Sequence, residues 1–402
     1  MKRAAALKTP EPVADEALAE RRDPERASAP GGLAQDIAAV ALATGQSPMS
    51  LIQSYVRLAM GPGKIGFKDY VKLRLFDPSF HESGELERFV GARRNRELCA
   101  KINYRHDWIA VLNDKIAASG YLQAWGLPCA PTAAIYAANI GRPGPERSCD
   151  PAGLKRFLTK AATYPLFGKP VDGAQSLGAL ALEGYDAGSG QLRLTGGELR
   201  HLDEVVSQIT TDYPHGYLFQ PLLRPHPQVK AVCGPRLATV RLVTLLRDGG
   251  AEVFRAAWKI PSGENIADNF WRSGNILADI DVTSGEVRRA VCGAGLEARL
   301  CGVHPDTGAG LVGFHHPQWR EMCELALEGA RLMRHMPLVG WDIALTDQGA
   351  MIIEMNEAPD LFLVQFAAGR GALDERFNAF VARQEQESRD FAAKVKAELS
   401  KL

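Results

Sequence analysis

The sequence has no excess of either charge and no long apolar run. Its 402 residues include 47 basic and 47 acidic side chains, so the formal net charge is zero. No overall field therefore favours nucleic acid or an anionic membrane as a partner. No stretch approaches the 18 or more apolar residues of a membrane span, and residues 1–32 lack the apolar core of a signal peptide. We expect a cytoplasmic protein without a membrane span, with a disordered tail over residues 1–32.

Cysteine is present, but not in the patterns that bind zinc or catalyse thiol exchange. The seven cysteines form no Cys-x-x-Cys pair and no cluster with histidine at zinc spacing. Free thiols of a cytoplasmic protein are the expected state. The sequence also contains no Walker A phosphate-binding motif and no internal repeat.

The hydrophobic periodicity predicts a helical region followed by alternating strands and helices. The predicted helices of the first part cover residues 33–43, 51–60, 67–75, 85–98 and 113–125. Thereafter we predict strands at 132–137, 166–170 and 216–222, helices at 150–160 and 199–209, hairpins at 238–259 and 276–291, and helices at 317–335 and 374–402. A chain of this length should form two or three packed units.

The most informative segment is residues 338–359, which reads as two strands around a tight turn. Asp347-Gln348-Gly349 suits a three-residue loop, and that register places Asp342 opposite Glu354. Because side chains alternate along a strand, Asn356 shares the face of Glu354. Three oxygen ligands on one face favour Mg²⁺. A hairpin with a merely solvated polar face is the alternative.

Two further segments have features of a nucleotide site. Lys169 ends an apolar strand and precedes a Gly/Ser loop over residues 173–178, whose backbone N–H groups could hold phosphate oxygens. Gln220-Pro221 ends another strand, and the amino group of an adenine ring could donate to the carbonyl of Pro221, for which the missing proline N–H is no loss. An ordinary surface loop and an edge strand ending at proline are equally compatible with these two patterns.

Taken in order, these motifs resemble the ATP-grasp superfamily, in particular its sugar-transfer-associated or glutamate-ligase-like branch. The resemblance covers roughly residues 67–380. The motifs are Asn113-Asp114-Lys115 before Gly126-Leu127-Pro128, Gly168-Lys169-Pro170, Phe219-Gln220-Pro221, Thr239-Val240-Arg241, and Asp342 with Glu354-x-Asn356.

The resemblance implies an α+β ATP-grasp fold in which two lobes clasp ATP below an N-terminal helical cap. It implies a cap over residues 33–130, a small lobe over 131–220 and a large lobe over 221–402. The chain differs from the usual pattern at Gln220, where glutamate is common, and at Gly274-Asn275, where a glycine pair is common.

The resemblance also implies a set of site residues. Lys115, Lys169 and Ser176 would contact the phosphates, while Gln220, Pro221, Leu223 and His226 would hold adenosine. Asp342, Glu354 and Asn356 would bind two Mg²⁺ ions, with Mn²⁺ as an alternative metal. Arg241, Lys259 and Asn269 would contact the transferred phosphate and the acyl phosphate.

The implied activity is an ADP-forming ligase that converts a small, anionic carboxylate substrate into an acyl phosphate. An amine or another nucleophile would then displace phosphate. A kinase that phosphorylates a hydroxyl and a non-catalytic ATP-binding module are the alternatives, because one fold supports several functions. The family association hints at cell-surface polysaccharide or natural-product pathways. The acceptor itself cannot be named from these residues.

Overall fold

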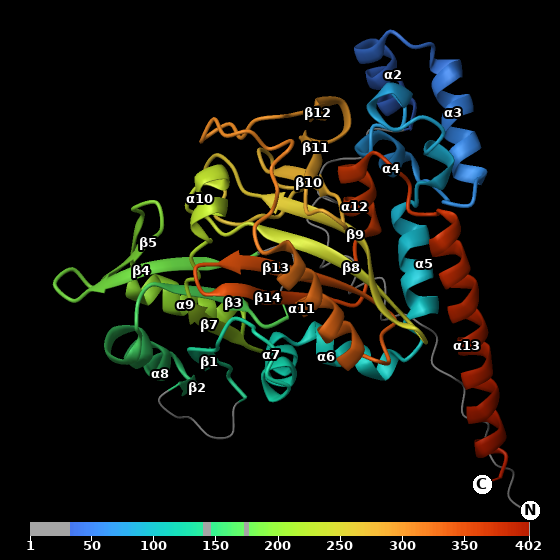
Figure 1. Cartoon of the computed structure of the whole chain (residues 1–402). Coiled ribbons are helices and arrows are strands. Elements are labelled where there is room, and N and C mark those ends of the chain that lie inside the picture. Colours follow the sequence, from blue (N-terminus) through green and yellow to red (C-terminus); the bar gives the residue numbers. More distant parts are fainter. Residues whose placement is uncertain (1–32, 140–145, 173–176, 402) are drawn as a thin grey trace, which may run out of the picture. The chain divides into compact units, whose positions relative to one another are not determined.

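The computed structural model describes residues 33–139, 146–172 and 177–401, which fall into two units divided between Pro48 and Met49 (Figure 1). The first unit contains helix α2 (Leu33–Thr44), which ends where Gly45 adopts a positive φ of 71°. A glycine suits this position because left-handed backbone is strained for other residues. The second unit contains both sheets and the remaining helices.

The N-terminal part of the second unit is helical, as predicted. Its helices are α3 (Pro48–Met60), α4 (Phe67–Lys72), α5 (Ala92–Ile102), α6 (Ile109–Asn113) and α7 (Lys115–Ala124), with short 3₁₀ turns at Pro78–Phe80, Leu86–Arg88 and His106–Trp108. The predicted helix over 85–98 is wrong in its first half. There the Gln365 side chain bonds both the N–H and the C=O of Val90, at 2.9 and 2.7 Å, which keeps this backbone out of a helix.

The smaller sheet has the strand order β2-β1-β7-β3-β4-β5-β6. Its strands are β1 (Ala134–Tyr136), β2 (Arg147–Ser148), β3 (Leu166–Pro170), β4 (Leu180–Asp186), β5 (Gln191–Leu194), β6 (Leu199–His201) and β7 (Tyr217–Pro221). Helix α8 (Pro151–Arg156), the π-turn Phe157–Ala161 and helix α9 (Leu202–Asp212) share a hydrophobic core with one face. Lys169 and Gln220 lie on the opposite face by strand alternation.

The larger sheet has the order β12-β11-β10-β9-β8-β13-β14. Its strands are β8 (Thr239–Arg247), β9 (Gly250–Ile260), β10 (Ile276–Ile280), β11 (Val287–Cys292), β12 (Arg299–Leu300), β13 (Leu338–Thr346) and β14 (Gly349–Asn356). Helix α10 (Pro227–Cys233) and a short 3₁₀ turn at Gly295–Glu297 lie in its connections.

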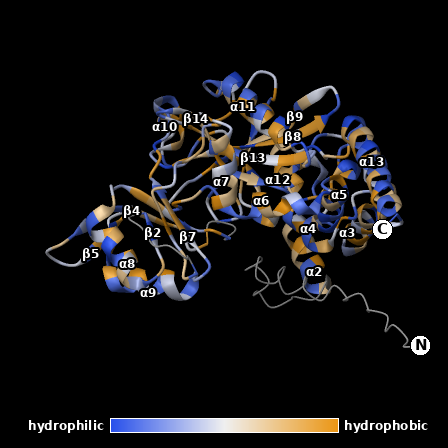
Figure 2. Ribbon diagram, turned by 90° about the horizontal axis from the view of Figure 1, so that it is seen from below, coloured by the Kyte–Doolittle hydropathy of each residue, from blue (hydrophilic) through white to orange (hydrophobic). Residues whose placement is uncertain are grey.

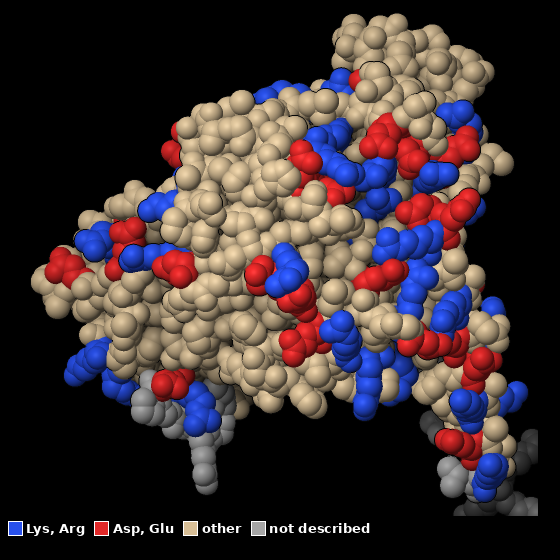
Figure 3. All heavy atoms as spheres, viewed as in Figure 1, with Lys and Arg blue, Asp and Glu red and all other residues tan. Residues whose placement is uncertain are grey.

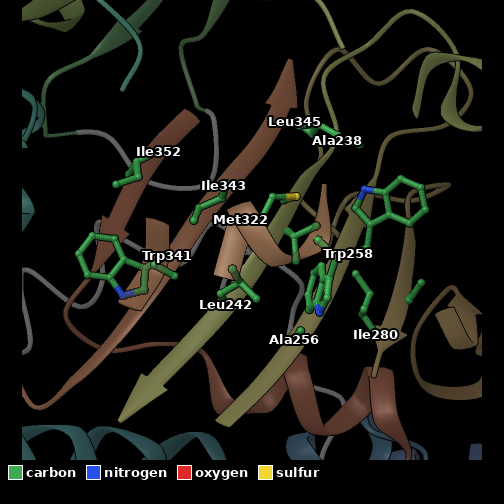
Figure 4. Packing of buried hydrophobic residues seen from close by; sticks show 14 of the residues in the cluster. Ala238, Leu242, Ala256, Trp258, Ile280, Met322, Trp341, Ile343, Leu345 and Ile352 are labelled. Carbon is green, nitrogen blue, oxygen red and sulfur yellow. The ribbon is translucent and has the colours of Figure 1, made fainter. Parts of the chain in front are cut away.

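Different helices contact different strands of this sheet (Figure 1). Helix α11 (Trp319–Leu332) packs against β8, β9, β13 and β14, and helix α12 (Leu361–Ala368) packs against β9, β10 and β11. Figure 4 shows part of the core shared with α11, which includes Met322 of this helix and Leu242, Trp258 and Trp341 of the sheet. The β13 residues of this core, Trp341 and Ile343, alternate with Asp342, so Asp342 points to the face away from α11.

The β13–β14 hairpin pairs Asp342 with Glu354, as predicted, but its turn is shorter than predicted and one strand contains a bulge. The turn has two residues rather than three, because Thr346 pairs with Gly349, and a β-bulge at Ile353 restores the register. The bulge lets both Ile352 and Met355 enter the core while Glu354 faces Asp342. Without the extra residue, either Ile352 would leave the core or Glu354 would enter it.

The β8–β9 hairpin is built in the same way. Its turn is Asp248-Gly249, Arg247 pairs with Gly250, and the register shifts where Val243 pairs with Arg255 and Thr244 with Val253. The predicted helix over 199–209 begins instead at Leu202, because residues 199–201 pair with β5. Strands β4 and β5 and helices α10 and α12 had not been predicted. The lobe bounds inferred from the resemblance stay predictions.

The surface carries both charges in alternation. Strands β8 and β9 are coloured mainly as hydrophobic in Figure 2, whereas the long helix α13 (Glu375–Leu399) carries many hydrophilic residues. Figure 3 shows basic and acidic side chains side by side along α13, and pairs such as Arg383–Glu387 lie 2.9 Å apart. None of the helices within the described ranges combines the length and apolarity of a membrane span.

Packing of α11 on the sheet should depend on Gly329. A methyl group there would lie 2.6 Å from the buried Trp341 ring, whereas a methyl group at Gly120 in α7 would meet nothing within 4 Å. We expect Gly329→Ala to lower the free energy of unfolding by about 1–3 kcal/mol. The control Gly120→Ala should raise it by about 0.5–1 kcal/mol. Urea unfolding measures both, and equal effects would contradict the packing described.

Candidate active site

Three charged side chains form a row across the larger sheet. Arg241 on β8 lies directly opposite Asp342 on β13, and Asp342 lies directly opposite Glu354 on β14. Lys259 on β9 lies opposite Thr239, two residues before Arg241 on the same face. Three of the predicted site residues are thus neighbours because of strand order and register, although Arg241 and Glu354 are 113 positions apart in sequence.

Asp342 is buried between two cations. Arg241 donates from Nε and Nη2 to the two carboxylate oxygens at 2.5 and 2.9 Å, and Lys259 Nζ lies 3.0 Å from Oδ2. Burial alone would raise the pKa of Asp342, but the charges of Arg241 and Lys259 outweigh it and hold the pKa well below the usual range. Asp342 is therefore ionised at neutral pH.

A second buried acid, Asp268, had not been predicted. Its carboxylate accepts from the Thr239 N–H at 2.9 Å and from the Thr239 hydroxyl, and it lies 3.7 Å from Lys259 Nζ. Burial raises the pKa of Asp268, while the charge of Lys259 lowers it. The sequence offered one signal for it, because Asp268 directly precedes the predicted site residue Asn269.

The two predicted phosphate-binding lysines approach Glu354 from outside the larger sheet. Lys115 Nζ lies 3.6 Å from Glu354 Oε1 and donates to the Val171 carbonyl at 3.3 Å. Burial lowers the pKa of Lys169, the charge of Glu354 raises it, and Lys115 lowers it. All three side chains line a cavity of about 30 Å³, together with Gln220. This volume holds about one water molecule.

The predicted adenosine contacts lie around the end of β7. Gln220 is buried and donates from Nε2 to the Ala130 carbonyl at 3.0 Å. His226 caps α10 by accepting from the Gln228 N–H at 3.3 Å. Leu223 is partly exposed, and the exposed Pro221 borders a larger cavity of about 530 Å³ on the other face of β7. Ser176 lies outside the described residues.

The loop between β9 and β10 is held together by Asn275. Its Nδ2 donates to the carbonyls of Ala267 and Asn269, at 2.9 and 2.7 Å, and its Oδ1 accepts from the Ser262 N–H at 3.1 Å. Asn269 itself accepts from the Trp271 N–H at 3.1 Å. Asn275 therefore joins both ends of the loop.

The residues present fit magnesium. Glu354 is partly exposed, and Asn356 donates from Nδ2 to the Gly340 carbonyl at 3.4 Å, which leaves its Oδ1 as an acceptor. A carboxylate has about four acceptor positions, and three of those on Asp342 are taken by Arg241 and Lys259. The donors are all oxygen, as Mg²⁺ requires. Among the described residues, no group of three His, Cys, Asp or Glu side chains could hold a metal ion by itself.

Comparison with known proteins identifies the family to which this chain belongs. A family model described as sugar-transfer associated ATP-grasp matches residues 93–380. The chain therefore belongs to the sugar-transfer associated ATP-grasp family, which confirms the resemblance found in the sequence. No curated protein matches the sequence.

The solved structures that are similar include two ligases and a carboxylase domain. The D-alanine-D-alanine ligase from Coxiella burnetii has 14% identity and a TM-score of 0.40, covering 72% of this chain and 62% of its own. D-alanyl-alanine synthetase A from Vibrio cholerae has 13% identity and a TM-score of 0.39, and the match covers 69% of this chain and 66% of that protein. A third is the biotin carboxylase domain of the Hydrogenobacter thermophilus 2-oxoglutarate carboxylase, solved with MgADP. It has 13% identity and a TM-score of 0.34, and the match covers 66% of this chain and 47% of that protein. This chain thus spans less than two thirds of the length of each.

Stability should depend on Asp342 far more than on Glu354. Asp342→Asn removes the ion-pair partner of the buried Arg241 and the nearer of the two carboxylates beside Lys259, and we expect the free energy of unfolding to fall by about 3–5 kcal/mol at pH 7. Glu354→Gln, at a partly exposed position, should cost less than about 1 kcal/mol.

The pH dependence has a defined sign. Folding depresses the pKa of Asp342. The contribution of ionised Asp342 to the free energy of unfolding is therefore complete above the ordinary Asp pKa of about 4, and it is lost as the pH falls from there toward the depressed pKa. The difference between wild type and Asp342→Asn should therefore shrink on acidification. Urea unfolding at several pH values measures it, and a constant difference would argue against the buried ion cluster.

Proposed function

We propose that the protein is an ADP-forming ligase that uses Mg-ATP to activate a small-molecule carboxylate as an acyl phosphate. An amine or another nucleophile then displaces the phosphate. The observation that carries the proposal is the cation cluster around Asp342 and Glu354. Arg241 and Lys259 reach it from the larger sheet, while Lys115 and Lys169 reach it from the opposite side. Membership of the ATP-grasp family supports it.

Four cations at one place suit phosphoryl transfer. The transition state carries its negative charge on the phosphoryl oxygens, so catalysis needs fixed positive charge and correct positioning more than covalent chemistry. In this proposal Lys115 and Lys169 bind the phosphates of ATP. Arg241, Lys259 and Asn269 hold the transferred phosphate and the acyl phosphate, and Asp342 keeps Arg241 and Lys259 in place before the substrates arrive.

Magnesium would be held by Glu354, the Oδ1 of Asn356 and the remaining acceptor position of Asp342. When bound, it supplies positive charge between the phosphates. Glu354 Oε1 lies 3.6 Å from Lys115 Nζ, so this lysine would approach the phosphates from beside the carboxylate that would bind the metal.

The adenine base would lie beside the end of β7, between the carbonyl of Pro221 and the N–H of Leu223, with Gln220 behind them and His226 toward the ribose. Ser176 and the loop around it would close over the phosphates. A cytoplasmic location and a role in cell-surface polysaccharide or natural-product synthesis complete the proposal. The family description alone supports the pathway.

The test is ADP release and hydroxamate formation by the purified protein. Mg-ATP, hydroxylamine and a panel of amino acids, sugar acids and hydroxy acids are supplied, because hydroxylamine traps acyl phosphates as hydroxamates. We expect ADP and hydroxamate in equal amounts with one class of acid. Glu354→Gln should lower both rates by about 10²-fold or more, since it removes a metal ligand.

A matched control is Glu252→Gln, a carboxylate paired with Arg376 at the far end of β9, which should leave both rates unchanged. ADP without hydroxamate would instead support a kinase acting on a hydroxyl. Nucleotide binding without ADP formation across the whole panel would favour a non-catalytic module.

A further inference from the structure

The β9–β10 loop (residues 261–275) carries an acid, Asp268, to which the proposed chemistry assigns no role. Its Oδ2 atom accepts from the backbone N–H of Thr239 at 2.9 Å and from the hydroxyl of the same residue. The other oxygen, Oδ1, lies 3.7 Å from Lys259 Nζ. Thr239 and Lys259 are directly opposite each other on β8 and β9, so one carboxylate reaches both.

Two carboxylates share the ammonium group of Lys259. Its Nζ lies 3.0 Å from Asp342 Oδ2 and 3.7 Å from Asp268 Oδ1, and the lysine side chain is buried. An ammonium group has three N–H donors, so one donor is left when each carboxylate takes one. Lys259 can therefore keep both carboxylates and still contact a phosphate oxygen.

The two cations beside Asp342 need different support. Arg241 bonds both oxygens of Asp342 through its planar guanidinium group, at 2.5 and 2.9 Å, which fixes its orientation. Lysine is a point charge on a flexible four-carbon stem. A single hydrogen bond to Asp342 would let the ammonium group of Lys259 swing about that contact. The second carboxylate, that of Asp268, restricts this movement.

The backbone on both sides of Asp268 is fixed by one buried amide. Nδ2 of Asn275 donates to the carbonyls of Ala267 and Asn269, the residues directly before and after Asp268, at 2.9 and 2.7 Å. Its Oδ1 accepts from the Ser262 N–H at 3.1 Å. Asp268 is therefore held in place from the loop, while Thr239 directs its carboxylate from β8.

We propose that Asp268 is a positioning residue for phosphoryl transfer, which fixes the ammonium group of Lys259 where the γ-phosphoryl group of ATP is bound. The inference rests on the function proposed above, in which Lys259 holds the transferred phosphate. Asp268 itself does not touch the substrate. Because it acts through Lys259, its charge matters for the γ-phosphoryl group and not for the rest of the nucleotide.

The experiment compares two nucleotides that differ in the γ-phosphoryl group. Titration calorimetry measures the binding of Mg-ADP and of Mg-AMPPNP, a non-hydrolysable ATP analogue, to the wild type and to Asp268→Asn. This substitution removes the charge but keeps an oxygen that can accept both bonds from Thr239.

The expected effect of Asp268→Asn is selective. The Kd of Mg-ADP should stay within about twofold, and that of Mg-AMPPNP should rise by about 10–100-fold, as when the partner that orients a metal ligand is removed. The rate of ADP formation should fall by a similar factor.

A double variant tests whether Asp268 acts through Lys259. Lys259→Met keeps an apolar stem of similar length without the charge. In that background, Asp268→Asn should cause no further loss of Mg-AMPPNP affinity, because the effects of two residues that act as one unit do not add. The matched control is Asp306→Asn, a carboxylate that accepts from the Gly263 N–H of the same loop at 2.8 Å. It should leave both dissociation constants unchanged.

A further variant covers the case that Asp268→Asn does not fold. Thr239→Val removes one of the two donors that direct the carboxylate and leaves its charge in place. It should then cause a smaller loss of affinity that is again confined to Mg-AMPPNP. An equal loss for both nucleotides would contradict the proposed role.

The outcomes separate this inference from the ligase function. Equal weakening of both nucleotides in Asp268→Asn would assign Asp268 a structural role and overturn this inference alone. Unchanged Mg-AMPPNP binding, or losses that add in the double variant, would also overturn it. ADP without hydroxamate in the wild type would overturn the ligase function only, because the binding measurements need no acceptor and still decide the role of Asp268. A wild-type protein that binds neither nucleotide would overturn both.

Discussion

The buried carboxylate of Asp342, held between Arg241 and Lys259, is the interaction on which the rest of the site depends. Removing charges from water costs several kcal/mol per ion, and attraction offsets this cost only when the geometry is good. The strand order β9-β8-β13 supplies that geometry by placing the three side chains on one face of neighbouring strands. Any other register would leave at least one charge buried without a partner. The three charged side chains therefore favour this one strand register, and the register in turn places the three side chains together.

The helical region is joined to the same hairpin by two buried amides. Asn103, at the end of α5, donates to the carbonyls of Leu338 and Glu357 and accepts from the Leu338 N–H, so it holds the start of β13 to the segment after β14. Gln365 on α12 bonds the backbone of Val90. These bonds are expensive to break because each amide would be left unsatisfied. They fix the helical region at the end of the hairpin where the charged row lies.

The sequence was most informative where local pattern and chemistry agreed. Asp342 and Glu354 could be predicted as a cross-strand pair because alternation and a turn signal both pointed to it. The bulge at Ile353 could not be predicted, since it follows from which apolar residues fit under α11. Asp268 was missed for a related reason, because it comes from a loop and only tertiary packing brings it to the sheet. The helix expected over 85–98 failed because a side chain 275 positions away competes for the Val90 backbone. Local propensity contains no information about such a partner.

The bulge at Ile353 has a consequence for how the hairpin tolerates change. A three-residue turn without a bulge and a two-residue turn with one both pair Asp342 with Glu354. They differ only in which side chains between the turn and Glu354 enter the core. Two distinct hairpins can therefore hold the same cross-strand pair, and a one-residue insertion in the turn is absorbed when the bulge disappears. The number of residues around Gln348 therefore does not by itself determine whether the carboxylates of Asp342 and Glu354 face each other.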